Sequence, residues 1–146
     1  TKLNYGKAVL SGDKGKRNDL NRAGIGCYLM ILPWNKVAFL RKLVTRQLPF
    51  SAHATDMTLK VVEKTELPDG WSVQGKTGMA YPRLPDYTFD EEHPWGWFVG
   101  WATKGDQTVV FARLIQDDKK MEGTAGVRAR DALFAELPSL VAGSNK

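Results

Sequence analysis

The stretch from Trp95 to Thr103 is apolar along nearly its whole length. Apolar residues and glycines occupy both its odd and its even positions, so a strand here would be buried on both faces. The turn sequence Lys104-Gly105-Asp106 follows, and Gln107 to Ile115 forms a second apolar segment, which predicts a β-hairpin. Because a doubly buried strand needs a layer of structure on each face, the hairpin requires two covers.

Three amphipathic segments can supply those covers. The first helix is predicted from Asn35, between Pro33 and Pro49, and a second is predicted from a Ser51 cap to about Lys64. A third covers Thr124 to Val141, where Pro138 is expected to bend or shorten it. The residues expected on the buried sides are Val37, Leu40, Leu43, Val44 and Leu48 in the first helix, Ala54, Met57, Val61 and Val62 in the second, and Val127, Leu133, Leu137 and Leu140 in the third.

A further strand is predicted after the turn Pro68-Asp69-Gly70. Trp71, Val73, Gly75 and Thr77 alternate there with Ser72, Gln74 and Lys76, so one face is packed and Lys76 leaves on the more polar face. Residues 80–94 are rich in proline and acidic residues, which predicts a surface loop.

The order of these elements predicts an α+β domain with three α/β/α layers around a mainly antiparallel sheet. Residues 1–146 are interpreted as a single, incomplete domain. Its predicted parts are a loop-rich entry at 1–34, helices at 35–64, sheet strands at 71–115 and a C-terminal helix at 124–141.

Composition narrows the ligand class. The net charge of +5 comes from scattered Lys and Arg, which favours anionic small molecules. The aromatic residues lie inside apolar strand patterns, so we expect no nucleic-acid partner. We also expect no metal, because His53 and His93 are not in a ligand spacing. We expect no membrane span, because no apolar run is long enough to cross a bilayer, and no signal peptide, because no charged leader precedes an apolar run. Cys27 is the only cysteine, so it cannot form an intrachain disulfide.

The tripeptide Lys76-Thr77-Gly78 is the main candidate for chemistry. It offers an ammonium and a hydroxyl to a carboxylate, and the glycine lets the backbone approach a ligand. Four other segments extend the pattern: Tyr5-Gly6, Val37 to Leu43, Leu48-Pro49 and Gly96 to Trp101. Together they resemble the C-terminal portion of class D (oxacillinase-type) serine β-lactamases over most of the chain.

The resemblance implies a partial β-lactamase/transpeptidase-like fold, a β-lactam antibiotic as partner, a function in antibiotic resistance and a periplasmic location. Lys76 would be the catalytic residue, helping proton transfer and stabilising negative charge. Thr77 and Arg128 would hold the substrate carboxylate, and Gly78 would let the backbone approach it. The Met79 N–H would form half of an oxyanion hole, with Tyr5 and Gly6 in a supporting shell.

The resemblance also implies missing parts. The family's Ser-x-x-Lys and Ser-x-Val motifs, and with them the serine nucleophile and the lysine that becomes carbamylated, belong to a region that this chain does not contain. Ser11-Gly12-Asp13-Lys14 has the literal spacing, but glycine and aspartate are poor residues for the start of a buried helix. We therefore expect no hydrolysis by the chain alone, no other cofactor, and either self-association or binding to a separate N-terminal half.

Two alternatives remain open from sequence. One is a non-catalytic penicillin-binding fragment that keeps the pocket formed by Lys76, Thr77 and Arg128. The other is a basic protein that binds anionic surfaces or nucleic acid, for which binding should fall steeply with salt.

Overall fold

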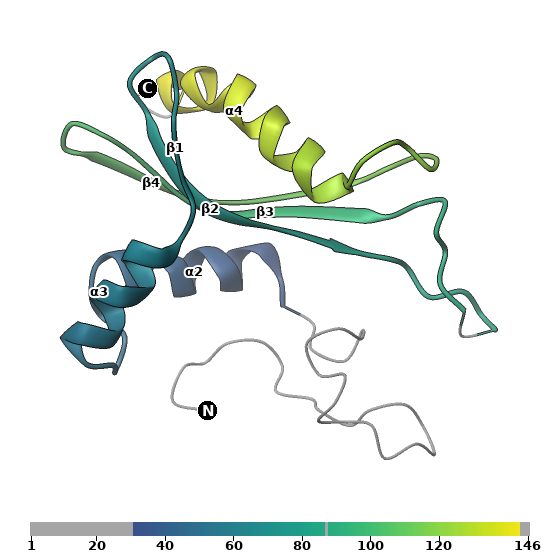
Figure 1. Cartoon of the computed structure of the whole chain (residues 1–146), viewed down its shortest axis with the longest axis horizontal. Helices are drawn as coiled ribbons and strands as arrows, with labels where there is room; N and C mark the ends of the chain where they lie inside the picture. The colour runs from purple at the N-terminus through teal and green to yellow at the C-terminus, as the bar shows by residue number, and fades with distance from the viewer. Residues whose placement is uncertain (1–30, 87, 144–146) are drawn as a thin grey trace.

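The computed structural model describes residues 31–86 and 88–143, which form three helices and four strands (Figure 1). In chain order the elements are α2 (Pro33–Val44), α3 (Ala52–Val61), β1 (Lys64–Glu66), β2 (Ser72–Ala80), β3 (Trp95–Lys104), β4 (Gln107–Gln116) and α4 (Ala125–Gly143). Tyr5, Gly6, Ser11, Lys14 and Cys27 lie outside the described residues.

The strands form one antiparallel sheet in the order β1-β2-β3-β4. The predicted hairpin is confirmed: β3 pairs with β4 along its whole length, and Gly105 turns the chain with a φ of 56°. The predicted end of the second helix at about Lys64 was wrong, because α3 ends at Val61 and Lys64 begins strand β1. The turn that ends at Gly70, with a φ of 85°, folds this short segment back onto β2.

Helices cover both faces of the sheet, so the predicted three-layer arrangement is confirmed. Figure 1 shows α4 on one side of the sheet and α2 with α3 on the other. On the first side, α4 packs mainly on β3, with further contacts to β2 and β4. On the second side, α2 packs on β4 and β3.

The α4 side holds the larger core. Its buried residues are Trp71, Val73, Phe98, Ala102, Phe111, Ala129, Leu133 and Leu137. The prediction that Val127 and Leu140 lie on the packed side was wrong, since they are 37% and 53% exposed. Small residues of α4 pack against the sheet instead. The backbone of α4 approaches β3 so closely that a Cβ at Gly96 would lie 2.1 Å from the Ala125 carbonyl oxygen. The helix continues through Pro138 to Gly143, so the proline does not shorten it.

The opposite side is packed less completely. Leu43, Leu48 and Trp101 form a smaller buried cluster there. Ser51 caps α3 as predicted, accepting a hydrogen bond from the Ala54 N–H at 3.1 Å. The predicted buried side of α3 was wrong, because Ala54, Met57 and Val61 are exposed and Val62 lies just beyond the helix, half-buried. The helix turns Thr55 and Leu59 inward instead.

Candidate functional site

The outer edge of β2 is open over its second half. β3 pairs with β2 from Ser72 to Ala80, whereas β1 pairs with it only as far as Gln74. The last backbone contact on the outer edge joins the Gly75 N–H to the Glu63 carbonyl oxygen at 3.3 Å. From Lys76 to Ala80, no strand of the described chain covers this edge, which we call the open edge.

Two backbone N–H groups point outward at the open edge. Alternate residues of a strand direct their N–H and C=O groups to the same side. Since the Gly75 N–H faces outward, those of Thr77 and Met79 face outward as well. The strand therefore presents donors to a ligand laid alongside it, including the Met79 N–H that the resemblance assigns to an oxyanion hole.

Lys76 lies along this edge. Its side chain is exposed, and its Nζ donates to the Thr77 carbonyl oxygen at 2.7 Å and lies 3.5 Å from the Thr77 Oγ1. The structure thus brings the predicted ammonium and hydroxyl together. An ammonium beside a hydroxyl and outward N–H groups can bind a carboxylate or stabilise a developing oxyanion.

The two glycines near the site have different roles in packing. A Cβ at Gly78 would meet Trp97 only at an ordinary 3.8 Å, so packing does not require glycine there. A Cβ at Gly126, the second residue of α4, would lie 2.6 Å from the Gly78 carbonyl oxygen. The first turn of α4 therefore rests directly on the backbone of the Lys-Thr-Gly element. Sequence reasoning missed Gly126, although a glycine in the first turn of a helix hints at such close contact.

Arg128 is bound elsewhere in the structure. Its Nη2 pairs with the Oδ2 of Asp117, its Nε lies 3.3 Å from the Oδ1, and its Nη1 donates to the Glu122 carbonyl oxygen at 2.7 Å. The Asp117 side chain is only 5% exposed, so this arginine neutralises a buried carboxylate. No hydrogen bond joins Arg128 to Lys76 or Thr77, and its predicted role in carboxylate binding stays a prediction.

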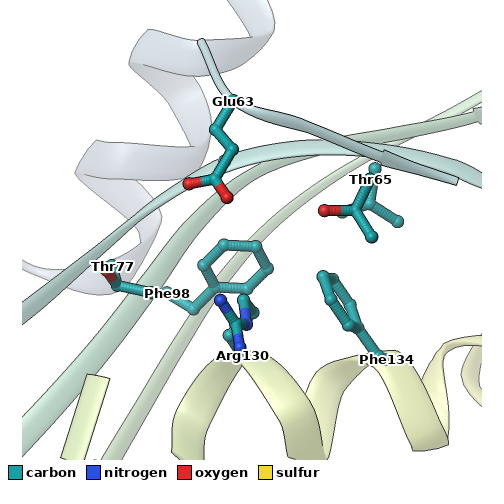
Figure 2. A pocket seen from close by; sticks show the side chains of 8 residues that line it. Glu63, Thr65, Thr77, Phe98, Arg130 and Phe134 are labelled. Carbon is teal, nitrogen blue, oxygen red and sulfur yellow. The ribbon is translucent and has the colours of Figure 1, made fainter. Parts of the chain in front are cut away.

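A small hollow lies on the α4 face of the sheet behind Thr77. Its volume is about 10 Å³, roughly room for one water molecule. Figure 2 shows Arg130 and Phe134 rising from α4 towards Phe98, with Glu63 on the opposite wall. The residues that line it are Glu63, Thr65, Val73, Gly75, Thr77, Phe98, Arg130 and Phe134. Sequence reasoning missed Glu63 and Arg130, because only the tertiary packing places them beside Thr77.

The loop that joins β2 to β3 begins after Ala80 and has internal contacts. Arg83 lies 4.4 Å above the Phe89 ring, and Tyr81 packs on the same ring at 6.4 Å. The Nδ1 of His93 lies 2.8 Å from the Oδ2 of Asp90, and this hydrogen bond holds the pKa of Asp90 below its ordinary value. The predicted surface loop is thus ordered locally around Phe89.

A lysine on α2 was also missed by sequence reasoning. The Nζ of Lys36 lies 4.5 Å above the Trp97 ring, and burial lowers the pKa of this lysine.

Within residues 31–86 and 88–143, His, Cys, Asp and Glu side chains form no group of three or more suited to a metal ion. In the same described ranges, no helix has the length and apolar character to cross a bilayer.

Comparison with known proteins decides the family. Residues 1–139 match the penicillin binding protein transpeptidase domain. The chain belongs to this family. It is 38% identical to beta-lactamase OXA-9 of Klebsiella pneumoniae over 140 residues, which are 96% of this chain and 51% of that protein. It is 27% identical to beta-lactamase OXA-1 of Escherichia coli over 139 residues, 94% of this chain and 48% of that protein.

A solved structure extends the similarity to the fold. The chain superposes on the class D β-lactamase OXA-427 with a TM-score of 0.83 and 38% identity, covering 97% of this chain and 58% of that one. The predicted resemblance to class D enzymes is therefore confirmed. The chain spans about half the length of the curated relatives it matches.

Proposed function

We propose that this chain supplies the substrate-binding half of a class D-like β-lactam site. The observation that carries the proposal is the open edge of β2, where Lys76, Thr77 and Met79 present an ammonium, a hydroxyl and outward N–H groups side by side. A penicillin carries a carboxylate and a reactive amide carbonyl on one rigid ring system. The open edge can bind both groups at once, which fixes the ring's orientation.

The reaction at a complete site would be acyl transfer. A serine oxygen attacks the β-lactam carbonyl carbon, the carbon–nitrogen bond of the ring breaks, and the nitrogen takes up a proton. The Met79 N–H would stabilise the oxyanion together with the serine's own N–H, and Lys76 would favour the negative charge that develops. Water would then release the acyl group with a carbamylated lysine as base. Both the serine and that lysine would come from outside residues 31–86 and 88–143.

A specific observation also supports the second candidate, a penicillin-binding chain without catalysis. Three serines lie in the described ranges, and each has a local structural role. Ser51 caps α3, the Ser72 Oγ donates to Glu66 at 3.2 Å, and the Ser139 Oγ donates to the Glu136 carbonyl at 2.7 Å. None of these bonds joins a serine to Lys76, so we expect none of these three described serines to form an acyl-enzyme. A periplasmic location and a function in antibiotic resistance belong to the first proposal, the class D-like β-lactam site.

A titration of the ¹⁵N-labelled chain with benzylpenicillin tests the binding claim. We expect saturable shifts of the Thr77 and Met79 amides, with little change at the β4 amides beyond the hairpin turn. Lys76→Met should weaken binding about tenfold, the effect of removing one charge-assisted hydrogen bond. Lys60→Met, an exposed lysine of α3, is the matched control. The absence of any shift at the open edge at millimolar benzylpenicillin would refute the proposal.

A further inference from the structure

We propose that a groove on the α2–α3 side of the sheet binds a small neutral aromatic molecule that carries a hydroxyl group. The groove lies between the C-terminal end of α2, the helix α3 and the hairpin end of the sheet (Figure 1). It is separate from the proposed β-lactam site, because Lys76, Thr77 and Met79 do not line it. The inference therefore goes beyond the proposed function and does not depend on it.

The groove has room for an aromatic ring. Its volume is about 260 Å³, whereas apolar cavities of about 150 Å³ already hold one benzene molecule. Its apolar lining comes from Val44 of α2, Leu59 of α3 and Trp101 of β3. Trp101 is only 5% exposed and is packed against Leu43 and Leu48, so the surface on which a ligand ring would stack is already fixed.

The lining of the groove favours an uncharged ligand. Among the described residues, no Lys, Arg, His, Asp or Glu side chain lines it. An ion that left water for this groove would lose hydration without gaining a charged partner, which is unfavourable. The groove therefore selects against the anions that the positive net charge of the chain attracts.

Gln74 supplies a hydrogen-bond acceptor of fixed orientation. Its Nε2 donates to the Leu59 carbonyl oxygen at 2.8 Å and to the Val62 carbonyl oxygen at 3.3 Å. These two bonds use both N–H groups of the amide and define which end of it is nitrogen. Within residues 31–86 and 88–143, no donor bonds to its Oε1, so this oxygen can accept a hydrogen bond from a ligand hydroxyl.

Threonine hydroxyls complete the polar lining of the groove. Thr103 and Thr108 are cross-strand partners in β3 and β4, and neither hydroxyl has a hydrogen-bonding partner in the described part of the chain. The third hydroxyl, that of Thr45, already donates to the Arg41 carbonyl oxygen at 2.8 Å. A ligand hydroxyl can therefore donate to Gln74 and accept from a threonine, while its ring packs on the apolar lining.

A titration of the ¹⁵N-labelled chain with phenol tests this site. We expect saturable shifts of the Gln74 side-chain amide and of the Trp101 and Thr103 backbone amides, with a Kd of about 1 mM. Nuclear Overhauser contacts should join the phenol ring to the methyl groups of Val44 and Leu59. Toluene has nearly the same shape but no hydroxyl, and should bind about tenfold more weakly. Benzoate, which carries a charge, should bind more weakly than phenol as well.

Two variants separate the acceptor from the space it serves. Gln74→Met should reduce the affinity for phenol about tenfold and leave the affinity for toluene unchanged, because only phenol uses the amide oxygen. Gln107→Met, an exposed glutamine at the start of β4, is the matched control. Thr108 is exposed, so Thr108→Trp can fill the groove without disturbing the core and should abolish the binding of both compounds. A thermal melt establishes that each variant is folded.

Three results would overturn the proposal. The first is equal affinity for phenol and toluene in the unaltered chain, and the second is phenol binding that Thr108→Trp leaves unchanged. The third is a set of Overhauser contacts to Trp34, Phe50 or Val61 alone, which would place phenol on the exposed apolar surface outside the groove.

The portion of OXA-9 that this chain does not match provides the last control. Phenol should still bind when this portion is added. Its displacement would show that the rest of the domain covers the groove, and the assignment of a small-molecule site would then be wrong. None of these outcomes bears on β-lactam binding at the open edge.

Discussion

The two faces of the sheet differ in how completely they are covered. On the α4 face, side chains of three strands and one helix form a continuous core, and Leu137 and Val73 are only 1% exposed. On the other face, α2 and α3 bury a small cluster and leave a groove of about 260 Å³ lined by Leu59 and Trp101 among others. Large apolar side chains stay exposed on or beside these helices, namely Trp34, Phe50, Met57 and Val61.

This difference indicates where further structure would be added. Apolar surface of this extent is typical of a face that packs against a partner. The chain spans about half of its curated relatives, and we propose that the remaining half of such a domain docks on the α2–α3 face and the open edge. The α4 face, by contrast, already has a continuous buried core.

The largest expected change in stability appears when alanine substitutions on the two faces of the sheet are compared. Leu137→Ala removes a side chain that is 1% exposed and should lower the free energy of unfolding by about 2–5 kcal/mol. Met57 of α3 is 45% exposed, so Met57→Ala should change the free energy of unfolding by less than about 0.5 kcal/mol. Urea denaturation measures both. Equal losses would show that the two faces are packed alike.

Two ion pairs give the next comparison. Arg128→Met leaves the buried Asp117 without its cation and should cost about 2–3 kcal/mol, most of which the double variant with Asp117→Asn should restore. Arg46→Met breaks a pair with Asp56 whose side chains are each 56% exposed, and should cost less than about 1 kcal/mol. A double-mutant cycle by chemical denaturation checks each pair. A large coupling for the exposed pair would contradict this ordering.

A third comparison concerns association. Val61 is 72% exposed on α3, and Val61→Lys places a charge in the exposed apolar surface. If copies of the chain associate through the α2–α3 face, this variant should lower self-association several-fold in sedimentation velocity, with little effect on the melting temperature. Leu140→Lys, 53% exposed on α4, is the control and should have a smaller effect. An equal effect of the two lysines would remove the distinction between the faces.

The smallest effect is a pH dependence on the α4 face. The hydrogen bond from Arg113 is the main reason that the pKa of Glu136 lies below its ordinary value near 4.5. The pair therefore contributes stability above that ordinary pKa and loses it as pH falls through the lowered value. Glu136→Gln should flatten the stability curve between pH 5 and 3, measured by urea denaturation at each pH. If the stability of the unaltered chain and that of Glu136→Gln depended on pH in the same way, the stabilising role of the Arg113–Glu136 pair would be contradicted.

The sequence predicted the elements better than their buried sides. Alternation around Val73 and the turn at Gly105 located β2 and the hairpin, because these signals are local. The buried side of α4 was partly missed, since the first turn of α4 lies so close to Gly78 and Gly96 that the small residues Ala125 and Gly126 are buried there. The apolar spacing of α3 predicted a packed side that the described residues do not cover.

The candidate site was predictable to a similar degree. The Lys76-Thr77-Gly78 element was evident as a motif, and its position on an open strand edge follows from how short β1 is. The partner of Arg128 could not be predicted, because Asp117 reaches it only through the packing of the β4–α4 connection.

We propose that this chain supplies binding groups to a site whose nucleophile lies elsewhere. The most direct test mixes the chain with benzylpenicillin and the separately expressed portion of OXA-9 that it does not match, and measures intact masses. We expect a covalent adduct on the added portion only when this chain is present, with a lower yield for Lys76→Met. An adduct on this chain itself, or one on the added portion in the absence of this chain, would show that the nucleophile and the binding groups are not divided in this way.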